Sequence, residues 1–324
     1  MATPHRLKII FMGTPEFAVA SLRALVEEGY PVVAVVTAVD KPAGRGRQMR
    51  GSAVKEYALQ QGIPVLQPER LRDEAFLAEL RRYGADLQVV VAFRMLPEVV
   101  WRMPACGTLN VHASLLPQYR GAAPINWALM NGEQETGVTT FFIDQDIDSG
   151  EIIGSHRVEI SEADTAGTLH DRLMAEGASL LLETVQAVED GTVTSHPQPA
   201  AGDLRPAPKI FRETCRIDWS RPAREVYNHI RGLSPYPAAW TAVQAPDGAV
   251  QVLKIYAATP ENFPSGSSPV PGTLQASGDT VRIAAADGWL QISELQMEGR
   301  KRMSAPDFLR GAAGFDAYRV VSRQ

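Results

Sequence analysis

Hydrophobic residues over the first 190 positions fall into short, nearly uninterrupted runs that alternate with stretches of helical spacing. Such runs are typical of strands buried on both faces of a parallel sheet. They lie at 7–12, 32–37, 87–92 and 107–112. Helical spacing occupies 16–28, 53–61, 72–82 and 165–188, and two further strands are expected at 137–143 and 151–160. The alternation predicts an α/β domain with a mostly parallel sheet and helices on both of its faces.

The pattern changes after residue 190. Residues 191–208 contain four prolines and two glycines, which is the composition of a connecting segment. Beyond them, short strands separated by turns are expected at 239–243, 249–257, 271–276, 279–284 and 289–297, a spacing that favours a small β-barrel. We therefore predict a Rossmann-like domain over 1–190, a linker over 191–208 and a smaller barrel domain over 209–324.

Composition and charge narrow the classes of protein that fit. Of 324 residues, 45% are apolar and 21% charged, so the chain can bury real cores and is not a disordered polyelectrolyte. The net charge of −5 means that a nucleic-acid partner would need local basic patches. Two distant cysteines, Cys106 and Cys215, argue against a disulfide framework or a cysteine-rich zinc site. With no signal peptide and no long apolar stretch, a cytoplasmic protein without membrane contact is expected.

Three polar residues stand out near predicted strand ends. Asn110 and His112 are two apart in the strand at 107–112, so their side chains share one face. Asp148 lies in the polar turn 144–150, which follows another predicted strand. An amide can donate to a developing oxyanion, an imidazole can donate or move a proton, and a carboxylate can orient and charge that imidazole. Together the three groups predict acyl-transfer chemistry.

Each of these residues also has a purely structural interpretation. A histidine at a strand end is more often a satisfied structural residue, and Asp-Ser-Gly is ordinary turn chemistry. The combination of motifs in one order is more specific than any single one. It consists of Asn110–His112, Ser114–Pro117, Arg120–Ile125 and Asp148–Gly150. This combination resembles the 10-formyltetrahydrofolate-dependent formyltransferase family.

The rest of the chain extends this resemblance to nearly its whole length. The matching segments are 11–17, 40–47, 54–55, 216–219, 230–237 and 303–305. Within the family, the chain resembles the members that formylate methionine carried on initiator tRNA. The resemblance therefore implies transfer of a formyl group from 10-formyltetrahydrofolate, a folate co-substrate, to the free α-amino group of methionyl-tRNA.

The resemblance also implies roles for individual residues. Asn110 and protonated His112 would hold the oxyanion, and Asp148 would orient His112 and assist proton removal from the attacking amine. The amine is expected to attack the formyl carbon directly, because no serine or cysteine lies beside an evident base. No metal ion is expected. The folate-contacting segment would consist of Ser114, Leu115, Leu116 and Pro117.

A basic segment marks where tRNA would be bound. Residues 41–51 carry four basic side chains, no acid and three glycines, so the backbone can approach phosphates closely. By resemblance, this loop reaches the acceptor stem, although a charge run is more often only a solvated face. Further basic runs at 205–231 and 300–302 accompany the second domain, which by resemblance is an oligonucleotide-binding-type (OB) barrel. No obligate protein partner is expected. The basic residues of the loop are Lys41, Arg45, Arg47 and Arg50.

Some aromatic and basic positions need separate treatment. Arg94 stands where many family members carry a glycine beside the expected pterin pocket, which leaves the shape of that pocket open. Three tryptophans of the second domain have faces on which bases can stack, but we expect them in the barrel core. They are Trp219, Trp240 and Trp289.

Three alternative functions remain open at this point. An N-formyltransferase acting on an amino-sugar nucleotide would share the three catalytic residues, although the basic segment and the closing Met303–Ala305 favour tRNA. A nicotinamide-dependent oxidoreductase would fit the sheet, yet the G-x-G-x-x-G fingerprint is missing after the first strand, where only Gly13 appears. A non-catalytic RNA-binding module would leave Asn110, His112 and Asp148 without a purpose.

Overall fold

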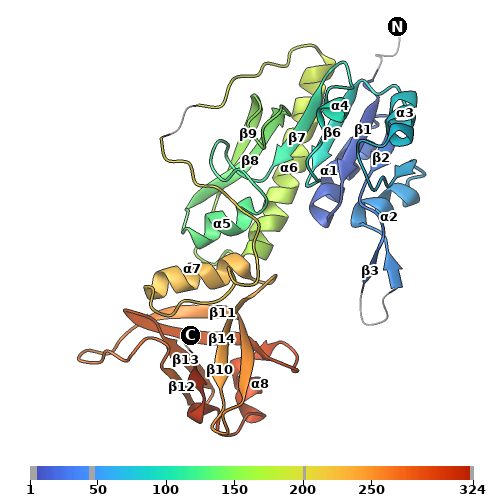
Figure 1. Cartoon of the computed structure of the whole chain (residues 1–324). Coiled ribbons are helices and arrows are strands. Elements are labelled where there is room, and N and C mark those ends of the chain that lie inside the picture. The colour runs from blue at the N-terminus through green and yellow to red at the C-terminus, as the bar shows by residue number, and fades with distance from the viewer. Residues whose placement is uncertain (1–5, 44–47, 200–201, 322–324) are drawn as a thin grey trace. The chain divides into compact units, whose positions relative to one another are not determined.

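A computed structural model describes residues 6–43, 48–199 and 202–321, which form two compact units (Figure 1). The units interleave along the sequence. The first takes the chain up to Gly121 together with 135–159 and 170–206, and the second takes 122–134, 160–169 and the chain from Ala207 onward. The domain boundaries expected at residues 190 and 209 stay a prediction.

The first unit is built on a sheet that has seven strands within the described residues, in the order β5-β2-β1-β6-β7-β8-β9. The first five in that order run parallel, whereas β8 is antiparallel to β7 and β9 to β8. The predicted α/β class with a mostly parallel sheet is confirmed. The bounds are β1 Ile9–Gly13, β2 Val32–Val36, β5 Val65–Leu66, β6 Leu87–Val91, β7 Thr108–His112, β8 Glu135–Phe142 and β9 Ile152–Glu159.

Helices cover both faces of this sheet. On one face, the apolar side of α3 packs Phe76 and Leu80 into a core with Val90 of β6. On the other face lies α6, where a Cβ added to Gly177 would come within 3.2 Å of Val111 Cγ1. The helix bounds are α1 Glu16–Glu27, α2 Ala53–Gln60, α3 Glu74–Arg82, α4 Glu98–Trp101 and α6 Ala166–Glu189. Among the described residues, no helix has both the length and the apolar composition that crossing a membrane requires.

The basic glycine-rich segment forms the arms of a hairpin, β3 (Lys41–Ala43) paired antiparallel with β4 (Gln48–Arg50). Asp40 anchors its base, because Gln67 Nε2 donates to Asp40 Oδ1 at 2.7 Å and Lys55 Nζ donates to Asp40 Oδ2 at 2.6 Å. Both bonds lower the pKa of Asp40, and the bond from Gln67 has the larger effect. The hairpin therefore projects from a fixed point on the first unit.

The second unit contains an antiparallel, barrel-like sheet in the order β12-β13-β14-β11-β10-β16, with β15 also paired to β14. This confirms the predicted barrel domain. Trp219 is buried in its core and Trp240 packs against that core, as expected, and Trp289 is buried beside Phe263. The strands are β10 Ala239–Gln244, β11 Val250–Asn262, β12 Leu274–Ser277, β13 Thr280–Ala284, β14 Gly288–Met297, β15 Met303–Ser304 and β16 Arg319–Val320. The helices are α5 Pro124–Met130, α7 Ala223–Leu233, α8 Ala305–Arg310 and the short η1 Phe315–Ala317.

His229 of α7 is expected to couple the stability of the second unit to pH. Burial lowers the pKa of His229 below its usual value, outweighing the hydrogen bond with the Cys215 backbone, which raises it. The neutral ring is therefore stabilised by folding. Since the unfolded chain takes up this proton first, that stability is present above about pH 6.5 and is lost as the pH falls toward the lower folded pKa.

We therefore expect His229→Gln to lose less unfolding free energy than the parent protein when the pH falls from about 7 to about 5. Urea denaturation at the two pH values measures this difference. His196→Gln is the matched control, because His196 is an exposed histidine of the first unit. Equal acid losses in the parent protein and in His229→Gln would show that His229 does not contribute to the acid sensitivity.

Candidate active site

Strand β7 places Asn110 and His112 on one face of the sheet. Asn110 lies between Val90 of β6 and Phe141 of β8, and His112 lies beside Thr139 of β8. Val111, between them, faces α6 on the opposite side. Asn110 is half-buried, and the side chain of His112 is only 7% exposed. The shared face expected from their spacing is therefore present.

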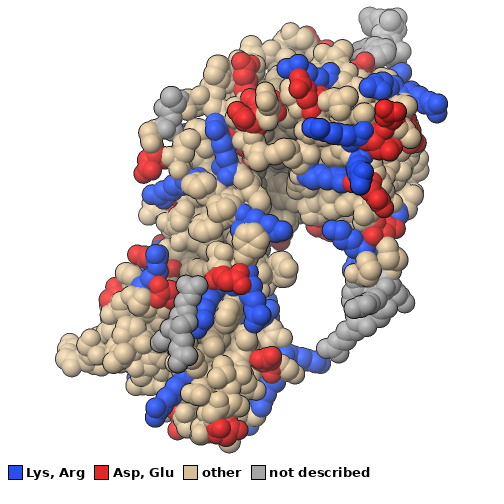
Figure 2. Space-filling model, in the orientation of Figure 1, with Lys and Arg blue, Asp and Glu red and all other residues tan. Residues whose placement is uncertain are grey.

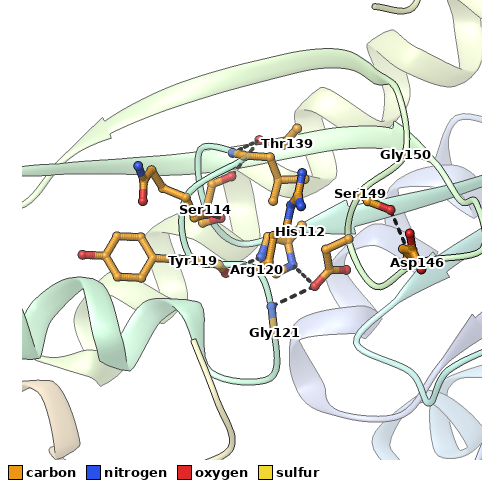
Figure 3. Close-up of polar contacts among 12 residues, drawn as sticks. His112, Ser114, Tyr119, Arg120, Gly121, Thr139, Asp146, Ser149 and Gly150 are labelled. Carbon is orange, nitrogen blue, oxygen red and sulfur yellow. Dashed lines mark hydrogen bonds and ion pairs between the residues drawn. The ribbon is translucent and has the colours of Figure 1, made fainter. Parts of the chain in front are cut away.

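The His112 ring lies between a carbonyl and a carboxylate (Figure 3). Its Nε2 is 2.9 Å from the Tyr119 carbonyl oxygen, which can only accept, so Nε2 carries a proton and donates it. Its Nδ1 is 3.7 Å from Asp148 Oδ2, within range of an ion pair but beyond a hydrogen bond. Only the protonated ring can donate from both nitrogens. The surroundings therefore present acceptors to both sides of the imidazole.

Asp148 reaches His112 by a route that the sequence pattern did not indicate. Because β8 runs antiparallel to β7, the turn after β8 begins beside the start of β7, where Ile143 N donates to Thr108 O at 2.8 Å. The turn then folds back along β7 to bring Asp148 to His112 at its far end. There the Gly121 N–H donates to Asp148 Oδ2 at 2.9 Å. The structure thus brings the predicted carboxylate and imidazole together.

The Asn110 amide has no hydrogen-bond partner among the described residues. It is half-buried on the same face as His112, in a position where water is partly excluded. Its amide atoms still reach solvent, because they are not among the buried side-chain atoms that lack a partner. The structure therefore leaves a donor available for a ligand beside His112.

The backbone around this site is strained. Of the four non-glycine residues with positive φ in the described ranges, three surround the end of β7. They are Ala92 (φ 48°), Tyr119 (φ 60°) and Asp148 (φ 52°). Each such conformation costs on the order of 1–3 kcal/mol, and such residues cluster where function requires a fixed geometry. Two of these three residues contact His112 directly.

The segment Ser114–Pro117 is mostly internal. The Ser114 hydroxyl donates to the Gln118 carbonyl at 2.7 Å, and Thr139 Oγ1 donates to the Ser114 carbonyl at 2.7 Å. Ser114, Leu116 and Pro117 are buried, and only Leu115 is half-buried. The Ser114 hydroxyl is therefore committed to holding its own turn, and no base among the described residues is hydrogen-bonded to it. Any ligand contact from this segment falls mainly to its backbone and to Leu115.

Two loops that flank β7 expose apolar side chains. Met95, in the loop after β6, is 67% exposed, and Ile147, next to Asp148, is 58% exposed. Exposed apolar groups on the loops that flank β7, together with an amide that has no partner among the described residues, fit a ligand that is partly flat and apolar and partly polar. Arg94 is held on the surface, where it donates to the carbonyls of Pro68 and Glu69. In the part of the chain that the structure describes, no group of three or more His, Cys, Asp and Glu side chains is placed to hold a metal ion.

The basic residues expected to meet tRNA are only partly described. Lys41 and Arg50 are exposed on the hairpin, and Arg50 Nε lies 3.6 Å from Glu56 Oε1. Arg45 and Arg47 lie outside the described residues. Figure 2 shows further Lys and Arg side chains on the face of the first unit from which the hairpin projects.

One basic residue of the second unit does not belong to a surface patch. Arg231 is only 5% exposed, and it bonds Asn228 Oδ1 at 2.9 Å and the Ser161 carbonyl at 2.9 Å. Its presence in the basic run 205–231 was therefore misleading. The spacing of α7 turns this residue toward the interior of its unit.

Comparison with known proteins identifies both parts of the chain. The model of the formyl transferase family matches residues 6–185, and the model of the formyl transferase C-terminal domain matches residues 209–313. Methionyl-tRNA formyltransferase from Bacteroides fragilis is 52% identical over 97% of this chain and 98% of that protein. The enzymes of the same name from Parabacteroides distasonis and Flavobacterium johnsoniae are 54% and 49% identical over 97% and 98% of this chain, and 98% and 99% of their own lengths.

Solved structures show the same fold at much lower identity. A sugar 3N-formyl transferase crystallised with dTDP and 5-N-formyl-THF has a TM-score of 0.66 at 20% identity, covering 92% of this chain and all of that one. HypX from Aquifex aeolicus, crystallised with tetrahydrofolic acid, has a TM-score of 0.61 at 20% identity, covering 94% of this chain and 47% of that one.

Proposed function

The chain belongs to the formyl transferase family, and from this premise we propose that it transfers the formyl group of 10-formyltetrahydrofolate to the free α-amino group of initiator methionyl-tRNA. The relatives that match it over nearly its whole length are methionyl-tRNA formyltransferases. The observation that carries the proposal is the arrangement on β7, where the partnerless Asn110 amide and the His112 ring share one face and Asp148 lies at that ring. This arrangement suits a reaction in which negative charge develops on a carbonyl oxygen.

Asn110 and His112 would stabilise that charge. When the amine attacks the formyl carbon, the carbonyl oxygen gains negative charge, and donors already in place lower the barrier. The Asn110 amide is one such donor. We assign the second donor to Nδ1–H of protonated His112. Nε2 is already bonded to the Tyr119 carbonyl, whereas Nδ1 lies 3.7 Å from Asp148 Oδ2, which is too far for a hydrogen bond. The Tyr119 carbonyl then fixes the ring from its other side.

Asp148 would keep His112 charged and accept the proton of the attacking amine. Its Oδ2 takes the Gly121 N–H at 2.9 Å and faces the imidazole, which leaves its other oxygen available. The amine loses one proton as the new C–N bond forms, and N10 of the departing folate gains one as its bond to carbon breaks. Ser114 cannot serve as a nucleophile in this scheme, since its hydroxyl is bonded to Gln118. Direct transfer between the two nitrogens therefore needs no covalent enzyme intermediate.

The surroundings of these residues also fit a folate as formyl donor. Met95 and Ile147 offer exposed apolar surface beside the site, to which the half-buried Leu115 of the segment Ser114–Pro117 adds, and the Asn110 amide offers a polar group. A pterin ring combines a flat face with a polar edge, which matches these two kinds of contact. The chemistry proposed for Asn110, His112 and Asp148 needs no metal ion. A cytoplasmic location belongs to the same proposal.

The proposal is tested by a formylation assay with purified protein and 10-formyltetrahydrofolate. Charged initiator methionyl-tRNA is offered in one reaction and a dTDP-amino sugar in another, each with radiolabelled acceptor. We expect formyl-methionyl-tRNA to form and the sugar nucleotide to remain unchanged. Formylation of the sugar nucleotide alone would overturn the choice of substrate, and no formylation of either would overturn the reaction itself.

Binding of tRNA is expected to depend steeply on salt. Each phosphate contact made by a basic side chain releases counterions, so the logarithm of the affinity should fall linearly with the logarithm of the salt concentration. Double charge removal with Lys41→Gln and Arg50→Gln on the exposed hairpin should reduce the slope by about one to two. Fluorescence titration of labelled methionyl-tRNA at several KCl concentrations measures this slope.

Arg157→Gln is the matched control for this titration, because Arg157 is an exposed arginine paired with Glu135 at another place on the first unit. We expect its slope to equal that of the parent protein. A flat salt dependence in the parent protein would contradict the proposed phosphate contacts.

A further inference from the structure

We propose that Gln198, in the connecting segment, is a positioning residue that holds Asp148 against His112. The inference rests on the proposed function, because it assigns Gln198 to the turn that carries the catalytic carboxylate. It goes beyond that function by adding to the machinery a residue that makes no contact with His112. Gln198 is half-buried, and the groups that it contacts belong to the first unit.

The Gln198 amide makes four hydrogen bonds. Its Oε1 accepts from Arg120 Nε at 3.1 Å and from Arg120 Nη2 at 2.6 Å. Its Nε2 donates to the Asp148 carbonyl at 2.8 Å and to the Gly150 carbonyl at 2.9 Å. Arginine can only donate and a carbonyl can only accept, so the partners fix the orientation of the amide.

These bonds connect the two turns that surround the imidazole. The Asp148 turn supplies the carboxylate, and Arg120 lies between Tyr119, which accepts from His112, and Gly121, which donates to Asp148. Figure 3 shows His112 with Tyr119, Arg120 and Gly121 on one side and Ser149 and Gly150 on the other. A single side chain from a distant part of the sequence therefore joins both halves of the site.

The Asp148 turn needs such a clamp. The φ of 52° at Asp148 is unfavourable for a residue with a side chain and persists only where neighbours hold it. Gly150 is fixed, because a Cβ there would come within 1.7 Å of the Phe142 carbonyl oxygen. By bonding both carbonyls, Gln198 ties the strained residue to this fixed one. The direction of the Asp148 carboxylate follows from that attachment.

The segment that carries Gln198 is itself held on both sides. His196 exchanges two backbone hydrogen bonds with Ile152, at 2.9 and 3.0 Å. Further along, the Arg205 carbonyl accepts from Tyr119 N at 2.7 Å, and Arg205 N donates to Gln118 Oε1 at 2.9 Å. The stretch that its prolines and glycines marked as a linker thus contacts both turns of the site. This explains how one amide in it can be placed accurately.

Substituting Gln198 with glutamate separates the two halves of its contacts. A carboxylate of the same shape keeps Arg120, now as an ion pair, but loses both donors and faces two carbonyl oxygens. We expect Gln198→Glu to lower kcat by about 10-fold to 10²-fold, because a misplaced catalytic group costs that much. KM for methionyl-tRNA should stay unchanged, and the pH–rate profile should resemble that of Asp148→Asn. Ser195→Ala, which removes a bond from the same segment to Glu151, should leave rate and profile unchanged.

A double mutant shows whether Gln198 acts through Asp148. If it does, Gln198→Glu should add little to the loss already caused by Asp148→Asn. Normal kcat and pH profile in Gln198→Glu, together with a slow Asp148→Asn, would overturn the positioning role and leave the proposed function intact. Normal activity in Asp148→Asn would instead overturn the catalytic role assigned to Asp148, whereas no formylation of methionyl-tRNA by the parent protein would overturn the proposed function. If Gln198→Glu fails to fold, Gln198→Ala is measured in the same way, and full activity in it would overturn the positioning role.

Discussion

Replacing His112 with alanine is expected to slow single-turnover formylation of methionyl-tRNA by at least about 10²–10³-fold, the usual effect of removing one oxyanion donor. The substitution removes the Nδ1 donor and also leaves the Tyr119 carbonyl without its 2.9 Å partner. Rapid-quench measurement with enzyme in excess isolates the chemical step from product release. Urea denaturation of the variant shows whether the cavity that it creates affects the fold.

Asn110→Asp is the matched variant for this measurement. It preserves the shape of the side chain but replaces the amide donor by an acceptor, so it should also lose about 10²–10³-fold in the chemical step. His156→Ala serves as the control, since His156 is a half-buried histidine that lies between Glu176 and Glu183, away from β7. Near-normal single-turnover rates in both His112→Ala and Asn110→Asp would exclude them as oxyanion donors.

Asp148→Asn is expected to reduce kcat by about 10²-fold or more, the scale of a lost acid–base group. Asparagine tolerates a φ near 52°, and its amide oxygen can still accept from Gly121 N–H, so the turn should keep its geometry. This same oxygen is the atom that faces His112 Nδ1, and in asparagine it carries no negative charge to stabilise the protonated donor. Steady-state kinetics over a range of pH, with KM for both substrates, measures the effect.

The substitution Asp144→Asn tests whether the effect belongs to Asp148. Asp144 is an exposed carboxylate in the same turn, where it accepts a hydrogen bond from Ser149, and within the described part of the chain it forms no hydrogen bond or ion pair with His112. Its removal should leave kcat nearly unchanged. If Asp148→Asn retains full kcat at every pH while Asp144→Asn loses it, the proton-accepting role has been assigned to the wrong carboxylate.

The sheet of the first unit could be predicted because its strands are apolar on both faces. Runs such as Val32–Val36 and Leu87–Val91 contain almost nothing that suits a surface, and the structure buries nearly all of them. The strand β8 was also expected, but its antiparallel direction was not. Direction depends on which neighbour a strand pairs with, and an apolar run does not encode that.

Several helices were missed for different physical reasons. In α7 the spacing of Val226, Ile230 and Leu233 is regular, and it could have been recognised in the basic run that was interpreted only as charge. In contrast, α5 spans seven residues from Pro124 and is too short to show a clear period. The hairpin of β3 and β4 was hidden by its glycines, which are typical of irregular segments.

The polar side chains of the site could be predicted, but the groups that hold them could not. Asn110 and His112 are two apart in a strand, which puts them on one face whatever the tertiary fold. The Tyr119 carbonyl and the Gly121 N–H are backbone groups, which leave no mark in the sequence. Gln198 lies in a segment with the composition of a linker, and only the folded chain brings it to Asp148. The catalytic roles themselves stay a prediction until measured.

The central claim is that Asn110, His112 and Asp148 converge on one carbon atom during transfer. A crystal structure of the protein with 5-formyltetrahydrofolate, which carries a stable formyl group, tests it most directly. We predict a formyl oxygen about 2.7–3.1 Å from the Asn110 amide nitrogen, and within hydrogen-bond reach of the His112 ring. A folate bound with its formyl group away from β7, with neither Asn110 nor His112 contacting it, would contradict the account.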